Sequence, residues 1–128
     1  MDFNKFLENN TITSPSGKYQ IKASIYKINN YLDLLFYGGN RINIHLLDLD
    51  GKELSQLQTG LSHFMLWVIG WLQDQDTVVL FNYDFGTIAW EIVKGNNLQR
   101  IDRYDERYEI IYKRGKELYK TNSCIYYK

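Results

Sequence analysis

Histidine and cysteine are the side chains that most readily act as proton carriers, nucleophiles and transition-metal ligands. This chain has only His45, His63 and Cys124, which lie far apart in the sequence. Strand alternation places His45 on the polar side of a strand, and His63 lies in a loop before an apolar stretch. We therefore expect structural or surface roles for all three. We predict no catalytic residue, no metal site and no cofactor.

Three short motifs match the letters of known sites but lack the rest of each pattern. Asp48-Leu-Asp-Gly51 brings its glycine too early for an EF-hand calcium loop. Ser16-Gly17-Lys18 lacks the first glycine of a phosphate-binding loop. Asp84-Phe-Gly86 resembles a kinase magnesium motif, but neither a glycine-rich loop nor a catalytic loop accompanies it. We interpret all three as turns.

The stretch from Phe64 to Glu91 holds the strongest candidates for binding. It contains all three tryptophans, and no Lys or Arg occurs between residues 61 and 91. The Tyr83, Asp84, Phe85 corner puts two aromatic residues and an acid at a turn, where burial is difficult, and this combination favours a protein-binding hot spot. Packing of the turns on their own domain explains the aromatic residues equally well. The candidate binding residues are Asp74, Asp76, Tyr83, Asp84 and Phe85.

The tryptophans themselves are interpreted as core rather than as a platform for a ligand. Alternation puts Trp67 and Trp71 on the same face of one strand. Trp90 can pack against them from a neighbouring strand.

The formal net charge of the chain is zero, which disfavours nucleic-acid binding driven by bulk charge. The charges are nevertheless unevenly distributed. Residues 61–91 carry four acids and no base, and residues 92–128 carry nine bases and five acids. Such asymmetry can steer a charged partner onto one face, although residues far apart in sequence can also mix in space.

Alternating apolar residues and regularly spaced turns predict a mainly β protein. A short helix is expected at 2–10, followed by a Pro-Ser-Gly turn. An antiparallel meander sheet or sandwich of about six to eight strands then follows. The expected strands begin at Lys18 and continue at 31–37, 41–47, 64–72, 77–83, 87–93, 98–102 and, as a last edge strand, 124–127. A short segment at 53–58 follows the third of them.

The segment from 105 to 120 admits two interpretations. A helix is favoured because Tyr104, Tyr108, Ile111 and Leu118 fit one helical face. A hairpin of 107–113 and 117–120 is the alternative, and Gly115 weakens the helix by about 1 kcal/mol relative to Ala.

Length and composition predict one domain, 1–128, in the cytoplasm. A chain of 128 residues can bury a single core, and its one cysteine excludes an intrachain disulfide. The N-terminus lacks the pattern of a signal peptide, and the apolar run 64–72 is too short to cross a bilayer. We expect no association with a membrane.

Several phrases together resemble small bacterial immunity proteins, which are encoded beside polymorphic or contact-dependent growth inhibition toxins. They are Ser14-Pro-Ser-Gly-Lys-Tyr19, Trp71 with Asp74, Thr77-Val-Val-Leu80, Asp84 and Trp90-Glu-Ile92. The same phrases look like β-propeller blades, but no regular repeat is present. The resemblance covers about residues 13–93.

The resemblance implies a cytoplasmic protein that binds a cognate toxin domain, in many cases a basic nuclease, and covers its active site. An acidic patch of Asp74, Asp76 and Asp84 would steer such a partner, with Tyr83 and Phe85 as anchors. The alternative is a small β-domain enzyme or ligand-binding protein with a tyrosine-lined pocket. A subunit of a larger assembly is a third interpretation.

Overall fold

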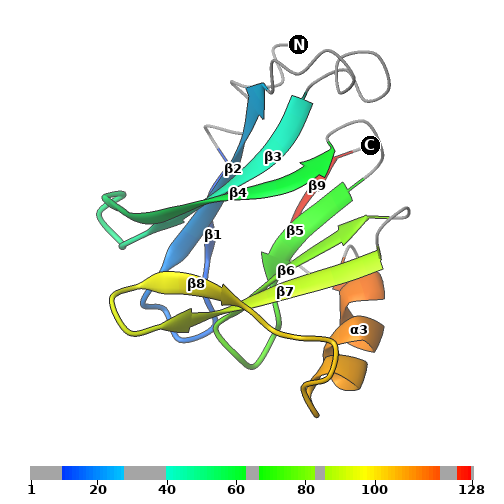
Figure 1. The fold of residues 1–128 in the computed structure, drawn as a ribbon. Coiled ribbons are helices and arrows are strands. Elements are labelled where there is room, and N and C mark those ends of the chain that lie inside the picture. Colours follow the sequence, from blue (N-terminus) through cyan, green and yellow to red (C-terminus); the bar gives the residue numbers. More distant parts are fainter. Residues whose placement is uncertain (1–9, 28–39, 63–66, 83–85, 119–123, 128) are drawn as a thin grey trace.

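The structure is a computed structural model that describes residues 10–27, 40–62, 67–82, 86–118 and 124–127. The expected helix at 2–10, the expected strand at 31–37 and the predicted anchors at 83–85 lie outside these residues. The described chain forms two antiparallel sheets and one helix, which confirms the predicted mainly β class (Figure 1).

The first sheet has four strands that follow one another along the chain, in the order β1-β2-β3-β4. Its strands are β1 (Ile12–Thr13), β2 (Gln20–Lys27), β3 (Asn40–Leu47) and β4 (Glu53–Ser62). Alternate residues of β2 and β3 are apolar and buried, and Ala23 pairs directly with Ile44. This sheet therefore has one apolar face and one polar face.

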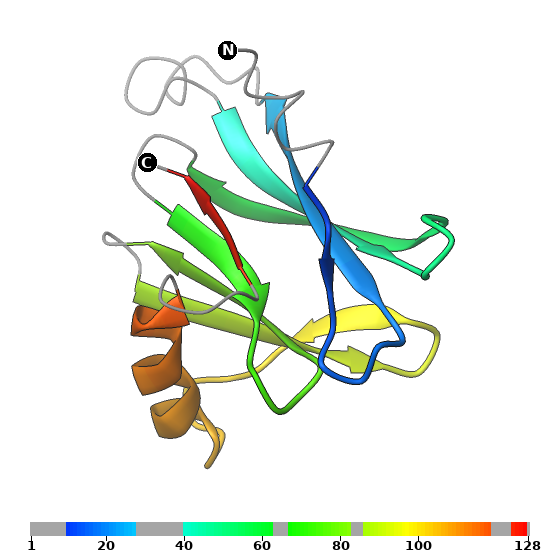
Figure 2. The same ribbon diagram turned by 180° about the vertical axis from the view of Figure 1, so that it is seen from behind.

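The second sheet has five strands in the order β8-β7-β6-β5-β9. Its strands are β5 (Trp67–Trp71), β6 (Thr77–Asn82), β7 (Gly86–Val93), β8 (Asn97–Arg100) and β9 (Cys124–Tyr127). β9 returns from the C-terminal end of the chain to pair with β5, as Figure 2 shows from behind. The prediction of a last edge strand at 124–127 is confirmed.

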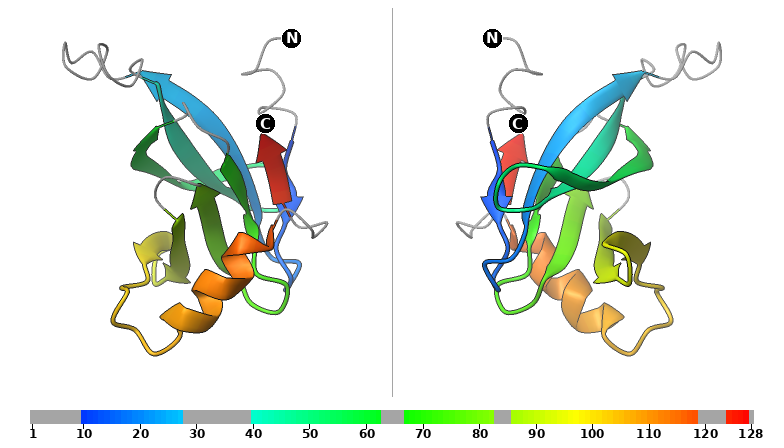
Figure 3. Two further views of the ribbon diagram at one scale, coloured as in Figure 1. Left: turned by 90° about the vertical axis from the view of Figure 1, so that its right-hand side faces the viewer. Right: turned by 90° about the vertical axis from the view of Figure 1, so that its left-hand side faces the viewer.

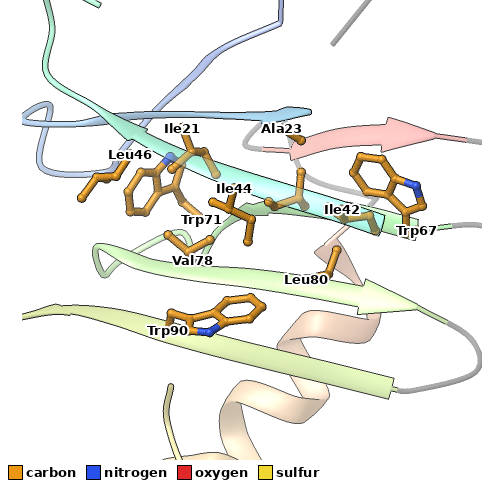
Figure 4. Close-up of a cluster of buried hydrophobic side chains, with 11 residues drawn as sticks. Ile21, Ala23, Ile42, Ile44, Leu46, Trp67, Trp71, Val78, Leu80 and Trp90 are labelled. Carbon is orange, nitrogen blue, oxygen red and sulfur yellow. The ribbon is translucent and has the colours of Figure 1, made fainter. Parts of the chain in front are cut away.

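The apolar faces of the two sheets meet in the main core (Figure 4). All three tryptophans belong to this core, as predicted, and none is more than 5% exposed. Strand register explains how they meet, because Val78 pairs with Trp71 on one side and with Trp90 on the other. Trp71, Val78 and Trp90 thus form a row across the neighbouring strands β5, β6 and β7.

The helix α3 (Tyr108–Lys116) covers the other face of the five-stranded sheet (Figure 3). Beneath it lies a second apolar cluster, to which β5, β6 and β7 contribute. The cluster consists of Val68, Leu72, Val79, Phe81, Ala89, Ile101, Ile111 and Leu118. Because β5 and β6 are buried on both faces, they are apolar at almost every position instead of alternating.

The helical interpretation of the C-terminal segment is confirmed, and the hairpin alternative is wrong. The helix is shorter than the expected 105–120, and Tyr104 lies in a turn before it rather than on its buried face. Gly115 is buried where α3 approaches β7, and a Cβ atom there would lie 2.4 Å from Cγ2 of Thr87. The glycine therefore allows close packing at the expense of helix propensity.

The main differences from the predicted strands lie at β8, β4 and β1. The strand expected at 98–102 is β8, which begins one residue earlier and ends at Arg100. Gly60 was expected to end the segment 53–58, but β4 continues through it to Ser62. The glycine has a φ of 72°, its N–H donates to the Tyr26 hydroxyl over 3.0 Å, and the register with β3 shifts between Arg41 and Asn43. A bulge thus keeps the strand in the sheet. The short strand β1 was not predicted, and the Trp71 indole N–H donates to its Ile12 carbonyl over 2.9 Å.

Candidate protein-binding surface

Asp74 and Asp76 lie in the turn between β5 and β6, which the Leu72 N–H closes by donating to the Thr77 carbonyl. Asp74 is exposed, and Nη1 of Arg114 on α3 donates to its Oδ1 over 2.8 Å. This hydrogen bond, helped by the positive charge of the guanidinium, lowers the pKa of Asp74 below its ordinary value. The acidic turn is therefore tied to the helix.

Asp76 is held from the other side of the turn. The backbone N–H of Ser16 donates to its Oδ1 over 3.1 Å, and the Ser16 hydroxyl contacts its Oδ2. Ser16 belongs to the turn between β1 and β2. The turn that contains both predicted acids is thus anchored to the four-stranded sheet through Asp76 and to α3 through Asp74.

Glu91 is the third described acid of residues 61–91, and it also has a basic partner. Arg107 donates from Nη1 to Oε2 of Glu91 over 2.8 Å. Its Nε and Nη2 donate to the two carboxylate oxygens of Asp105, which makes a bidentate contact. The side-chain hydrogen bond from Arg107 lowers the pKa of Asp105 to about 2, and the same contacts raise the pKa of Arg107.

Part of the negative charge of residues 61–91 is therefore neutralised inside the molecule by bases of the C-terminal segment. Asp74 and Glu91 each pair with an arginine of the C-terminal segment, so these two carboxylates are not unopposed. Tyr83, Asp84 and Phe85 lie outside the described residues. Their described neighbours Asn82 and Gly86 lie at the opposite end of β6 from Asp76.

Large apolar side chains are exposed at three described positions, and two of them belong to the segment around α3. Tyr104 is 80% exposed and Ile110 is 63% exposed, whereas Leu49 is 55% exposed in the turn between β3 and β4. Ile110 was not among the residues predicted from the sequence to bind a partner. Its signal is the pair Ile110-Ile111, because consecutive residues of a helix cannot both face the same core.

Ile110 has a defined setting on the helix. Residues three and four apart are neighbours on a helix surface, so Ile110 lies between Arg107 and Arg114. Both arginines are engaged with carboxylates, at Glu91 and Asp105 on one side and at Asp74 on the other. An apolar side chain with ion pairs on two sides has the arrangement of a small interface centre with a polar rim.

Tyr104 borders an open hollow of about 540 Å³ at the start of the helix. The Arg103 guanidinium lies 4.9 Å from the centre of the Tyr104 ring and donates to its hydroxyl over 2.8 Å. Arg100, Asp102 and Tyr108 complete the lining. We call Tyr104, Ile110 and the ion pairs of Arg107 and Arg114 the helix surface. Tyrosine and arginine are the residue types enriched at binding hot spots.

Within the ranges that the structure describes, His, Cys, Asp and Glu form no group of three or more suited to a metal ion. In the same ranges, no helix combines the length and apolar character needed to span a membrane.

The chain was compared with protein-family models, with curated proteins and with solved structures, and none of the three comparisons found a match.

Proposed function

We propose that this protein is an immunity protein that binds and neutralises a cognate toxin domain, and that the helix surface is where it binds. The observation that carries the proposal is the exposure of Tyr104 and Ile110 in a segment whose other residues are largely charged or buried. Exposed apolar side chains framed by polar groups are typical of sites that become buried in a complex. The resemblance to immunity proteins supplies the class of partner and the cytoplasm as its compartment.

The helix surface includes one of the acids predicted from the sequence. Asp74 forms its edge through the ion pair with Arg114, and Asp76 follows two residues later in the same turn. A basic toxin would compete with Arg114 for Asp74, because both offer positive charge to the same exposed carboxylate. Acidic residues at this edge would then contribute to the rate and register of association, and the apolar centre to its lifetime.

The test is co-expression of the protein with the toxin domain encoded beside its gene, followed by measurement of cell survival and of the dissociation constant. Replacing Tyr104 by Ala and Ile110 by Ser should weaken binding about tenfold or more, because central aromatic and apolar contacts dominate interface energies. Leu49→Ser is the matched control, since Leu49 is also exposed but lies in the turn between β3 and β4. Equal binding by both variants would place the interface elsewhere.

A second experiment addresses the acids. Reversing the charge at Asp74 and Asp84 should slow association with a basic toxin, with a smaller effect on dissociation. Because Asp74→Lys also breaks the pair with Arg114, Arg114→Gln is its control. An association rate that is the same for all of these proteins would count against acidic steering.

The hollow beside Tyr104 favours a second candidate function, which is binding of a small anionic ligand. Two tyrosines, two arginines and one acid, Asp102, line it, and because the arginines outnumber the acid the hollow suits a ligand with an aromatic ring and a negative charge. Calorimetric titration with an adenine nucleotide as probe tests this candidate. Nucleotide binding by the wild-type protein that is lost in the Arg103→Gln variant would support a small-ligand site. If the wild-type protein shows no heat of binding, this candidate function is wrong and protein binding at the helix surface remains.

A further inference from the structure

Three polar side chains meet on the outer face of the four-stranded sheet, which is the face turned away from the main core. They are Ser24 on β2, His45 on β3 and Glu53 at the start of β4. Nε2 of His45 lies 2.6 Å from Oγ of Ser24, and Nδ1 of His45 contacts Oε1 of Glu53. Residues from three neighbouring strands thus form one hydrogen-bonded chain in the order serine, histidine, carboxylate.

The carboxylate fixes which nitrogen of the imidazole carries the proton. An ionised carboxylate only accepts hydrogen bonds, so Nδ1 of a neutral His45 must be the protonated nitrogen that faces Glu53. Nε2 then keeps its lone pair and accepts the hydrogen bond from the Ser24 hydroxyl. This is the proton arrangement in which a histidine can remove the proton of a serine nucleophile.

The surroundings of the pair add an independent observation. Asn43 pairs directly with Ser24 across the two strands, and its Nδ2 lies 3.4 Å from Nε2 of His45. Asn43 is only 3% exposed, yet within the described residues its Oδ1 has no hydrogen-bond partner. A buried polar group without a partner needs an explanation, and a bound polar molecule is one. The His45 side chain keeps 13% of its surface exposed and that of Glu53 46%, so solvent reaches the cluster.

We propose that Ser24 is an activated nucleophile, with His45 as its general base and Glu53 as the residue that positions His45. The substrate class is a carboxylic ester or a related acyl compound. The oxygen of Ser24 forms a bond to the acyl carbon while its proton passes to Nε2 of His45. The ester C–O bond then breaks, and the leaving alcohol takes that proton. Water, deprotonated by His45 in the same way, releases the acid and restores Ser24.

This site is separate from the helix surface. Ser24 and His45 lie on the outer face of the four-stranded sheet, and α3 covers the far face of the five-stranded sheet (Figure 3). The two sheets and the main core stand between them. Reactivity at Ser24 and binding at the helix surface can therefore be tested independently.

The experiment is labelling of the full-length protein with an alkyl fluorophosphonate, with the modified residue located by mass spectrometry. In this reaction the Ser24 oxygen forms a bond to phosphorus, fluoride leaves, and the proton passes to His45. We expect the label on Ser24 and not on Ser16, an exposed serine whose hydroxyl contacts the Asp76 carboxylate without a histidine. The maximal labelling rate and the concentration for half-maximal rate are measured separately.

His45→Gln should lower the maximal rate about 100-fold or more, with little change in the half-saturating concentration. Glu53→Gln should also lower the maximal rate, and Glu53→Asp should recover part of it. Glu53 is half-exposed, so its variants test the proposal even if His45→Gln impairs folding. No label on Ser24, or a labelling rate that is the same in the wild-type protein and the Glu53→Gln variant, would overturn the proposal and leave the cluster a purely structural network.

Discussion

At the scale of single residues, two arginines decide how charge is arranged around the helix. Arg107 binds Glu91 and Asp105, and Arg114 binds Asp74. The sequence shows that acids and bases are segregated along the chain, but pairing depends on where β5, β7 and α3 lie in space. No spacing rule in the sequence relates Asp74 to Arg114, forty positions away, so these pairs could not be predicted.

The contact between Arg107 and Asp105 gives a testable titration. Hydrogen bonds from Arg107 lower the pKa of Asp105 from 3.8 to about 2 in the folded protein. Since the folded pKa is the lower one, the pair stabilises the fold above about pH 4. That stabilisation disappears as the pH falls through about 2.

An NMR titration of the Asp105 carboxyl group should therefore give a midpoint near 2, and Arg107→Gln should return it toward 3.8. Arg107→Lys is the control that keeps the positive charge but loses the bidentate contact, so the pKa of Asp105 should be intermediate in this variant. A midpoint near 3.8 in the wild-type protein would show that the pair does not form in solution.

At the scale of elements, the contact between α3 and β7 depends on one glycine. Helix propensity alone predicts that Gly115→Ala stabilises the protein by about 1 kcal/mol. The structure predicts the opposite, because the new Cβ would lie 2.4 Å from Cγ2 and 2.7 Å from Oγ1 of Thr87. Overpacking of this kind costs about 1–3 kcal/mol, so the net effect should be a loss of stability.

Urea denaturation of three proteins checks this expectation. Gly115→Ala should unfold at lower urea concentration than the wild type, and addition of Thr87→Ala should recover stability because it removes the two closest atoms. A Gly115→Ala protein that is more stable than the wild type would mean that the helix does not pack against β7 at this distance.

Most strands could be predicted from the sequence, but the full length of β4 could not. Alternation in β2 and β3 and the apolar runs of β5 and β6 were sufficient to predict strands, because burial on one or both faces determines residue type directly. The continuation of β4 through Gly60 was missed, since a glycine that ends a strand and one that makes a bulge look alike in sequence.

At the scale of the whole molecule, the described chain is a three-layer structure with the five-stranded sheet in the middle (Figure 1). Trp71 connects the two sheets. Its ring is fully buried in the core between the sheets, and its indole N–H reaches the Ile12 carbonyl on the edge strand β1. The core role of this residue was predictable from its type and spacing. Its bond to Ile12 was not, because it joins two sheets.

Trp71→Phe should accordingly destabilise the protein by about 2–4 kcal/mol, from the cavity left behind and the loss of the hydrogen bond to Ile12. Thermal unfolding followed by circular dichroism measures the loss. Leu49→Ser, at an exposed turn, should change the unfolding temperature little by comparison. Similar effects of the two changes would be inconsistent with a buried, hydrogen-bonded Trp71.

Some residues of the proposed binding site could be recognised from the local sequence, and others only from the three-dimensional structure. Asp74 and Asp76 were candidates because turn residues are recognisable in sequence, and the structure places both in one turn. Tyr104 and Ile110 were not candidates. Tyr104 fitted the buried face of a helix that in fact begins after it, and the exposure of Ile110 follows only once the buried face is known.

The measurement that tests the proposed immunity function most directly is survival of cells that produce this protein together with a candidate toxin domain encoded beside its gene. We expect the wild-type protein and the Leu49→Ser control to protect the cells. The Tyr104→Ala, Ile110→Ser double variant, folded to the same extent by circular dichroism, should fail to protect them. Absence of protection by the wild-type protein would contradict the immunity function, and full protection by the double variant would contradict the helix surface as its binding site.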